Sequence, residues 1–124
     1  MRFLVADDHE LVRDTVAAFL AHEGVGLVEK ASSLDEAMEM AVARDGYDLV
    51  LLDYCMPGMS GLDGLARMQK ANGGKPVALI SGTATPDVAD RALKAGAAGF
   101  IPKTMPSASM VNAARVMAAG EVYA

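Results

Sequence analysis

The stretch that decides the fold is Leu49-Val50-Leu51-Leu52-Asp53. Four consecutive apolar residues predict a short strand that is buried on both faces, as a central strand of a parallel sheet is. The aspartate marks the end of that strand. Comparable short apolar runs predict four further strands, at residues 3–6, 25–30, 76–80 and 98–101.

Longer stretches with apolar residues at helical spacing separate these runs. They predict helices over residues 10–23, around 62–68, over 86–96 and over 106–119, and one more after Ser33. Ser33 and Glu36 have the spacing of a capping box, in which a serine caps the helix and a glutamate reaches back. The apolar spacing also predicts that Phe19 and Val42 lie on the inner faces of the first two helices.

Strand and helix therefore alternate five times, a (βα)5 pattern typical of an α/β fold with helices on both faces of a parallel sheet. We expect a doubly wound, flavodoxin-like sheet of five strands in the order 2-1-3-4-5, in three α/β/α layers. A length of 124 residues predicts one domain over residues 1–124, with no second domain in the chain.

Composition excludes several classes of protein. Apolar residues make up 52% and charged residues 22%, which excludes a disordered chain. A single cysteine excludes an internal disulfide framework and a thiolate zinc site. The net charge of −5 argues against binding nucleic acid or a membrane surface by this domain alone. Without an apolar run long enough for a signal peptide or a membrane span, we expect a cytoplasmic protein.

Polar side chains follow four of the five expected strands, where each strand ends. They are Asp7, Asp8, Asp53, Ser81 and Lys103. Because ligands of an open parallel sheet bind beyond the carboxyl ends of its strands, we expect these side chains to meet in one crevice. Neighbouring carboxylates repel one another, and a cation relieves that repulsion.

Carboxylate and carbonyl oxygens favour Mg²⁺ or Mn²⁺ over zinc. A lysine and a hydroxyl beside such an ion suit a phosphoryl group. One carboxylate can then act as the nucleophile and form an aspartyl phosphate.

These residues, in this order, resemble the receiver domain of two-component response regulators. The resemblance covers essentially the whole chain and rests on four motifs: Asp7-Asp8, Asp53 with Met56-Pro57-Gly58, Ser81-Gly82, and Phe100-Ile101-Pro102-Lys103. Together with residues 119–123, they are similar to receivers that precede a helix-turn-helix DNA-binding domain.

The resemblance implies a role for each site residue. Asp53 is the phosphoacceptor. Asp8, Asp53 and the main-chain carbonyl of Cys55 ligate Mg²⁺, while Asp7 contacts the metal through water. Lys103 pairs with a phosphoryl oxygen.

The resemblance also implies a switch, in which Ser81 moves toward the phosphate and the Phe100 ring turns inward. The face formed by residues 86–119 then changes shape and binds a partner. Phosphoryl groups come from a sensor histidine kinase or a histidine phosphotransfer protein, and homodimerisation on phosphorylation is an open expectation. Such a receiver catalyses only its own phosphorylation and dephosphorylation, so we do not expect an enzyme. The implied output is transcription through a DNA-binding domain absent from this chain; a stand-alone phosphorelay carrier is the alternative.

Two other functions share features of this pattern. A flavin mononucleotide binder has the same topology, but it needs a loop after the first strand that attracts phosphate, and Asp7-Asp8-His9 would repel one without a metal. A phosphatase with an aspartyl intermediate would need His9 or Glu10 as its acid–base residue. His9 beside Asp8 could ligate a metal, but we place it at the exposed start of the first helix. Cys55 and Thr83 occupy positions that tune phosphorylation rates in receivers.

Overall fold

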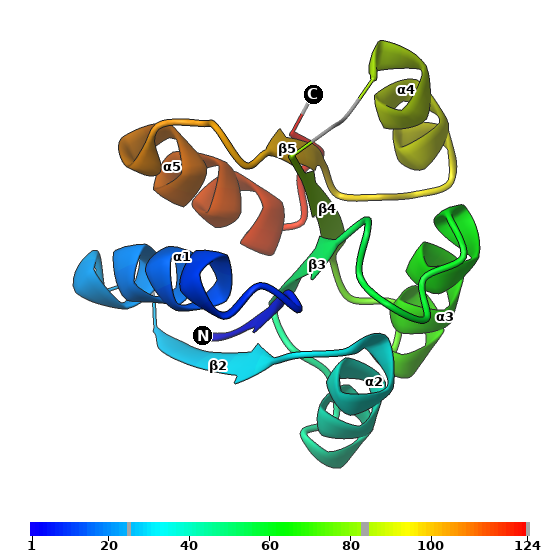
Figure 1. The fold of residues 1–124 in the computed structure, drawn as a ribbon. Coiled ribbons are helices and arrows are strands. Elements are labelled where there is room, and N and C mark those ends of the chain that lie inside the picture. Colours follow the sequence, from blue (N-terminus) through cyan, green and yellow to red (C-terminus); the bar gives the residue numbers. More distant parts are fainter. Residues whose placement is uncertain (25, 83–84, 124) are drawn as a thin grey trace.

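The computed structural model describes residues 1–24, 26–82 and 85–123, over which strands and helices alternate along the chain (Figure 1). The strands are β1 (Arg2–Ala6), β2 (Leu27–Ala31), β3 (Leu49–Asp53), β4 (Val77–Ser81) and β5 (Phe100–Pro102). The helices are α1 (Glu10–His22), α2 (Leu34–Ala43), α3 (Leu62–Ala71), α4 (Pro86–Lys94) and α5 (Ser107–Ala118).

The strands pair in parallel in the order β2-β1-β3-β4-β5, which confirms the predicted fold. Strand β3 lies in the centre, and every residue of it is buried. Helices α1 and α5 cover one face of the sheet, while α2, α3 and α4 cover the other (Figure 1). The result is a three-layer α/β/α sandwich.

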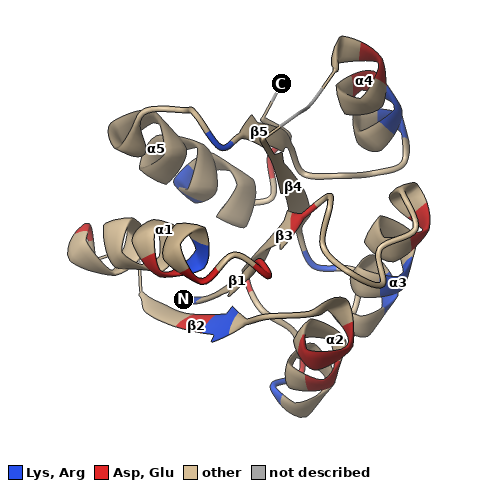
Figure 2. Ribbon diagram, in the orientation of Figure 1, with Lys and Arg blue, Asp and Glu red and all other residues tan. Residues whose placement is uncertain are grey.

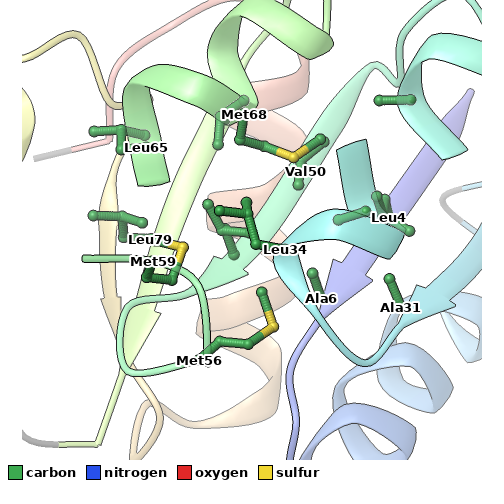
Figure 3. Packing of buried hydrophobic residues seen from close by; sticks show 14 of the residues in the cluster. Leu4, Ala6, Ala31, Leu34, Val50, Met56, Met59, Leu65, Met68 and Leu79 are labelled. Carbon is green, nitrogen blue, oxygen red and sulfur yellow. The ribbon is translucent and has the colours of Figure 1, made fainter. Parts of the chain in front are cut away.

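Alternate strand residues supply two separate cores. Leu4, Val50 and Leu79 point toward α2 and α3, where Leu34 and Met68 pack against them (Figure 3). The residues between them in the strands face α1 and α5 instead. Because both faces are covered, the strands read as continuous apolar runs.

Asn72 holds the amino-terminal side of the sheet together. It is fully buried after α3, and its side chain accepts a hydrogen bond from the backbone N–H of Tyr47 (2.7 Å). The same side chain donates to the backbone oxygens of Tyr47 (3.1 Å) and Lys75 (3.3 Å). One amide therefore satisfies backbone groups that precede β3 and β4.

Some local expectations are wrong. Phe19 is 40% exposed and Val42 is 69% exposed. Each lies next to a buried residue, Leu20 and Ala41 respectively, and one step along a helix turns the side chain away from the core. The capping box is displaced: Ser33 accepts from the Glu36 amide, but the Glu36 carboxylate accepts from the Ser32 N–H.

The fifth strand begins later than predicted, at Phe100, although the amide of Ala98 already donates to Val77 in β4 (2.9 Å). The expected first residue of the second strand, Val25, lies outside the described residues. Among the helices of the described ranges, none is long and apolar enough to cross a membrane.

Candidate functional site

The parallel pairing of β1 with β3 places the carboxyl ends of these two strands side by side. Ala6 of β1 pairs with Leu52 of β3, so Asp7 follows β1 at the height at which Asp53 ends β3. Strand β4 ends beside them at Ser81, whose backbone oxygen accepts a hydrogen bond from the N–H of Lys103 (2.9 Å). Figure 2 shows the acidic residues gathered where β1 and β3 end, and a basic residue in the connection after β5. Asp7, Asp8, Asp53 and Lys103 therefore lie together at this edge, and Ser81 ends the neighbouring strand.

Two buried carboxylates share one ammonium group at the centre of this edge. Asp7 is 0% exposed and Asp53 is 1% exposed. The Nζ atom of Lys103 lies 2.9 Å from Asp7 Oδ2 and 3.4 Å from Asp53 Oδ2. Neither of these two carboxylate oxygens accepts a hydrogen bond within the described part of the chain. The ion pair compensates part of their charge and leaves hydrogen-bonding capacity directed into the crevice.

The other oxygens of these carboxylates are fixed by backbone groups. Asp7 Oδ1 accepts from the N–H of His9 (2.9 Å), and Asp53 Oδ1 accepts from the N–H of Cys55 (3.1 Å). Asp8 stands at the rim with its side chain 33% exposed. The metal-binding atoms that Asp7, Asp8, His9 and Asp53 offer all lie within 4.8 Å of one another.

Burial and neighbouring charges shift the pKa values of Asp7 and Asp53 in opposite directions. Burial, together with the nearby charge of Asp7, raises the pKa of Asp53 to about 6 against the opposing effects of the Cys55 amide and Lys103. Burial also acts to raise the pKa of Asp7, but the hydrogen bond from the His9 amide and the contact with Lys103 outweigh it, so that pKa is lowered. Burial acts against the charged form of Lys103, yet both carboxylates hold its pKa above the ordinary value.

The expected switch residues lie on the neighbouring strands. Ser81 is buried at the end of β4. Phe100 is half-buried against the core beneath α2 and α3, and its ring meets Tyr54 edge to face with centroids 6.2 Å apart. The contact between Tyr54 and Phe100 was not predicted from the sequence, because no spacing pattern links the two residues. Thr83 lies outside the described residues.

The donor set fits a hard divalent cation. Asp7, Asp8 and Asp53 form an acidic cluster compatible with divalent metal binding. Carboxylates that converge at one edge of the sheet, with Asp8 partly exposed, match Mg²⁺ or Mn²⁺, which bind through one or two carboxylates and retain waters. The uncommitted oxygen of Asp53 gives such an ion a point of attachment.

His9 is placed as expected at the exposed start of α1, but its ring contacts the site. The imidazole is 64% exposed, yet Nδ1 lies 3.2 Å from Asp7 Oδ1 and 3.3 Å from Asp8 Oδ1. In the sequence, the only indication of this contact is that His9 directly follows Asp7 and Asp8. Only the turn after β1 decides which way the ring points.

Comparison with known proteins identifies the arrangement. The family model of the response regulator receiver domain matches residues 3–115. A glycerol metabolism activator of Pseudomonas putida is 35% identical over 123 residues, which are 98% of this chain and 56% of that protein. The sensory/regulatory protein RpfC of Xanthomonas campestris pv. campestris is 37% identical over 118 residues, covering 90% of this chain and 16% of that protein. The chain thus spans little more than half of the first relative and a small part of the second.

Solved structures agree in fold and in sequence. The signal receiver domain of the response regulator NarL from Mycobacterium tuberculosis superposes with a TM-score of 0.86 at 36% identity, covering 97% of each chain. A LuxR family DNA-binding response regulator from Silicibacter pomeroyi gives 0.85 at 33% identity, covering 100% of this chain and 96% of that one.

Proposed function

This chain belongs to the response regulator receiver domain family, and on that premise we propose that Asp53 accepts a phosphoryl group from a phosphohistidine of a sensor histidine kinase or a histidine phosphotransfer protein. The observation that carries the proposal is the position of Asp53. It is buried at the end of the central strand, and its Oδ2 atom faces the Lys103 ammonium group at 3.4 Å.

The surroundings of Asp53 suit nucleophilic attack. With a pKa of about 6, the side chain is mainly a carboxylate at neutral pH. The Cys55 amide orients the carboxylate through Oδ1. One oxygen of this carboxylate forms the bond to phosphorus while the bond from phosphorus to the donor imidazole breaks. Lys103 then pairs with a phosphoryl oxygen and offsets the added negative charge.

A divalent cation completes this proposal. Asp8, Asp53 and the main-chain carbonyl of Cys55 would hold Mg²⁺ or Mn²⁺, and Asp7 would contact it through water. When bound, the ion neutralises charge on the transferring phosphoryl oxygens. Asp7 is suited to the indirect role, because the His9 amide and Lys103 already engage its two oxygens.

We further propose that phosphorylation switches the face made by α4, β5 and α5. A phosphoryl group adds negative charge and strong acceptors beside Ser81, whose hydroxyl can donate to it. Phe100 sits on β5 at the border of the core and lacks a hydroxyl, so moving its ring inward leaves no polar group unpaired. Two packings that differ by a few kcal/mol can be exchanged by such contacts.

Transcription is the output that the relatives support best. One relative is called an activator, and one matching structure is a DNA-binding response regulator. We therefore propose that residues 1–124 form one receiver unit that works in the cytoplasm and controls a DNA-binding domain, with homodimerisation on phosphorylation. It would bind neither membrane nor nucleic acid itself, and it would turn over no separate substrate. The match to a sensory/regulatory protein supports the alternative of a phosphorelay carrier.

The test is phosphorylation by acetyl phosphate with Mg²⁺, followed by intact mass. The wild-type chain should gain one phosphoryl group, and chelating the metal should prevent this. Asp53→Asn should gain none, whereas Asp45→Asn serves as a matched control at an exposed site. Equal labelling of Asp53→Asn and the wild type refutes the assignment of Asp53. Passing the label to a histidine phosphotransfer protein separates the relay from the transcriptional output.

A further inference from the structure

His9 lies closer to the metal site than its exposed position suggests. Its Nδ1 atom is 3.3 Å from Asp8 Oδ1 and 3.9 Å from Asp53 Oδ2, the two carboxylates assigned to the metal. We propose that His9 Nδ1 is a further direct ligand of the cation and gives this receiver a preference for Mn²⁺ over Mg²⁺. The inference rests on the proposed function, since it concerns the metal that serves phosphorylation of Asp53.

The separations fit ligands of one ion. In an octahedral shell with bonds of about 2.1 Å, neighbouring ligand atoms are about 3.0 Å apart and opposite ones about 4.2 Å. The distance of 3.3 Å from Nδ1 to Asp8 matches a neighbouring pair. The distance of 3.9 Å to Asp53 lies between the two limits, so a small adjustment brings both pairs onto one cation.

The turn after β1 fixes the histidine backbone beside the cluster. His9 is the residue before the first turn of α1 and has extended backbone angles, with φ −88° and ψ 103°. Its N–H donates to Asp7 Oδ1 (2.9 Å), and its carbonyl accepts from the N–H of Arg13 (2.9 Å). Both backbone groups are thereby engaged, and Nδ1, the ring nitrogen nearer the backbone, is the one turned toward the carboxylates.

Both oxygens of Asp7 have other partners. Its Oδ2 is paired with Lys103 at 2.9 Å, and its Oδ1 accepts the His9 amide and lies 3.2 Å from His9 Nδ1, a contact that a bound cation would replace. The imidazole of His9 is the next donor along the chain, and its ligand atom belongs to the same cluster as those of Asp8 and Asp53. Because Asp8 is one-third exposed and His9 two-thirds exposed, waters can complete the shell.

Replacing an oxygen donor by an imidazole changes which ion binds best. Mg²⁺ is a hard cation that keeps oxygen ligands and waters. Transition metals accept imidazole nitrogen more readily, and Mn²⁺ retains the preference for carboxylates that the rest of the site demands. The mixed set of nitrogen and oxygen donors therefore favours Mn²⁺ within a pocket that Mg²⁺ also fits.

The decisive experiment is pulsed electron paramagnetic resonance of the chain loaded with Mn²⁺, read for coupling to imidazole nitrogen. The chain has only two histidines, which makes the assignment simple. The wild type and His22→Ala, altered at the far end of α1, should both show the coupling. His9→Ala should bind Mn²⁺ without it. Circular dichroism confirms that each variant is folded.

Calorimetric titration with Mn²⁺ and with Mg²⁺ gives the preference itself. His9→Ala should lower the ratio of Mn²⁺ to Mg²⁺ affinity by at least about tenfold, because losing even a residue that only orients a ligand lowers metal affinity by about that factor. Bound Mn²⁺ without nitrogen coupling in the wild type overturns the role of His9, as does a coupling that His22→Ala removes. Neither result touches the proposed function, which fails separately if Asp53 is not phosphorylated.

Discussion

Asp53→Asn should make the metal-free protein more stable at neutral pH, although it removes the proposed phosphoacceptor. The side chain is 1% exposed, and burial lifts the pKa of its carboxyl from 3.8 to about 6. The folded chain therefore holds this proton more tightly than the unfolded chain does. The contribution of Asp53 to stability is therefore fully present below about pH 4 and is lost as pH rises through about 6, where the buried group becomes charged.

The size of the effect follows from the shift. About two pKa units correspond to about 3 kcal/mol of lost stability above pH 6, at about 1.4 kcal/mol per unit. Asparagine keeps an oxygen for the Cys55 amide but gives up the 3.4 Å contact with Lys103. Lys103 retains Asp7 at 2.9 Å. We therefore expect a net gain of about 1–3 kcal/mol at pH 8.

Urea unfolding at pH 4 and pH 8, in a chelating buffer, measures this gain. Asp53→Asn should exceed the wild type at pH 8 and differ from it much less near pH 4, where the folded carboxyl is protonated and the unfolded one is only about half ionised. Asp45→Asn, exposed with a φ of 60° that asparagine tolerates, should change stability by less than about 0.5 kcal/mol at either pH. An equal gain at both pH values, or a loss at pH 8, would refute charge burial at Asp53 as the cause.

Three further substitutions probe other parts of the structure. Asn72→Leu should cost about 2–4 kcal/mol in urea unfolding, because several buried backbone groups lose their partner; a loss below about 1 kcal/mol would contradict this. Lys103→Met should raise the pKa of Asp53 above about 6, because the neighbouring positive charge is lost. Carbon-13 NMR of the carboxyl group measures this pKa, and an unchanged value would show that the ion pair contributes nothing. Gly64→Ala should lower the melting temperature by several degrees, since a Cβ there would meet the backbone of Met59 at 2.7 Å; an unchanged melting temperature would mean that the preceding loop adjusts freely.

The sequence was sufficient for the architecture. The run Leu49–Asp53 reads as a strand buried on both faces, and the alternation of such runs with helical spacing leaves the doubly wound sheet as the simplest solution. The order of the strands then places all their carboxyl ends at one edge. Because the carboxyl ends of parallel strands share one edge, the proximity of Asp7, Asp53 and Lys103 follows from the sequence.

The burial of two helix residues was predicted wrongly, because helical spacing does not define the edge of the apolar face. Phe19 and Val42 each neighbour a buried position, and a rotation of one residue about the helix axis moves a side chain from core to solvent. Periodicity defines the apolar face only approximately. The packing of α1 and α2 on the sheet selects which residues at its border are covered.

The sequence by itself determined which chemical groups end each strand. A buried strand is a short run of apolar residues, so the first polar residue after the run marks its end. Only the tertiary structure decided their electrostatic character and the direction of His9. Asp7 and Asp53 are the same residue type at equivalent strand ends, yet the pKa of one is lowered and that of the other is raised. Each carboxylate accepts one local amide, from His9 or from Cys55. Lys103 lies closer to Asp7 (2.9 Å) than to Asp53 (3.4 Å), and contacts between segments far apart in the chain set those distances.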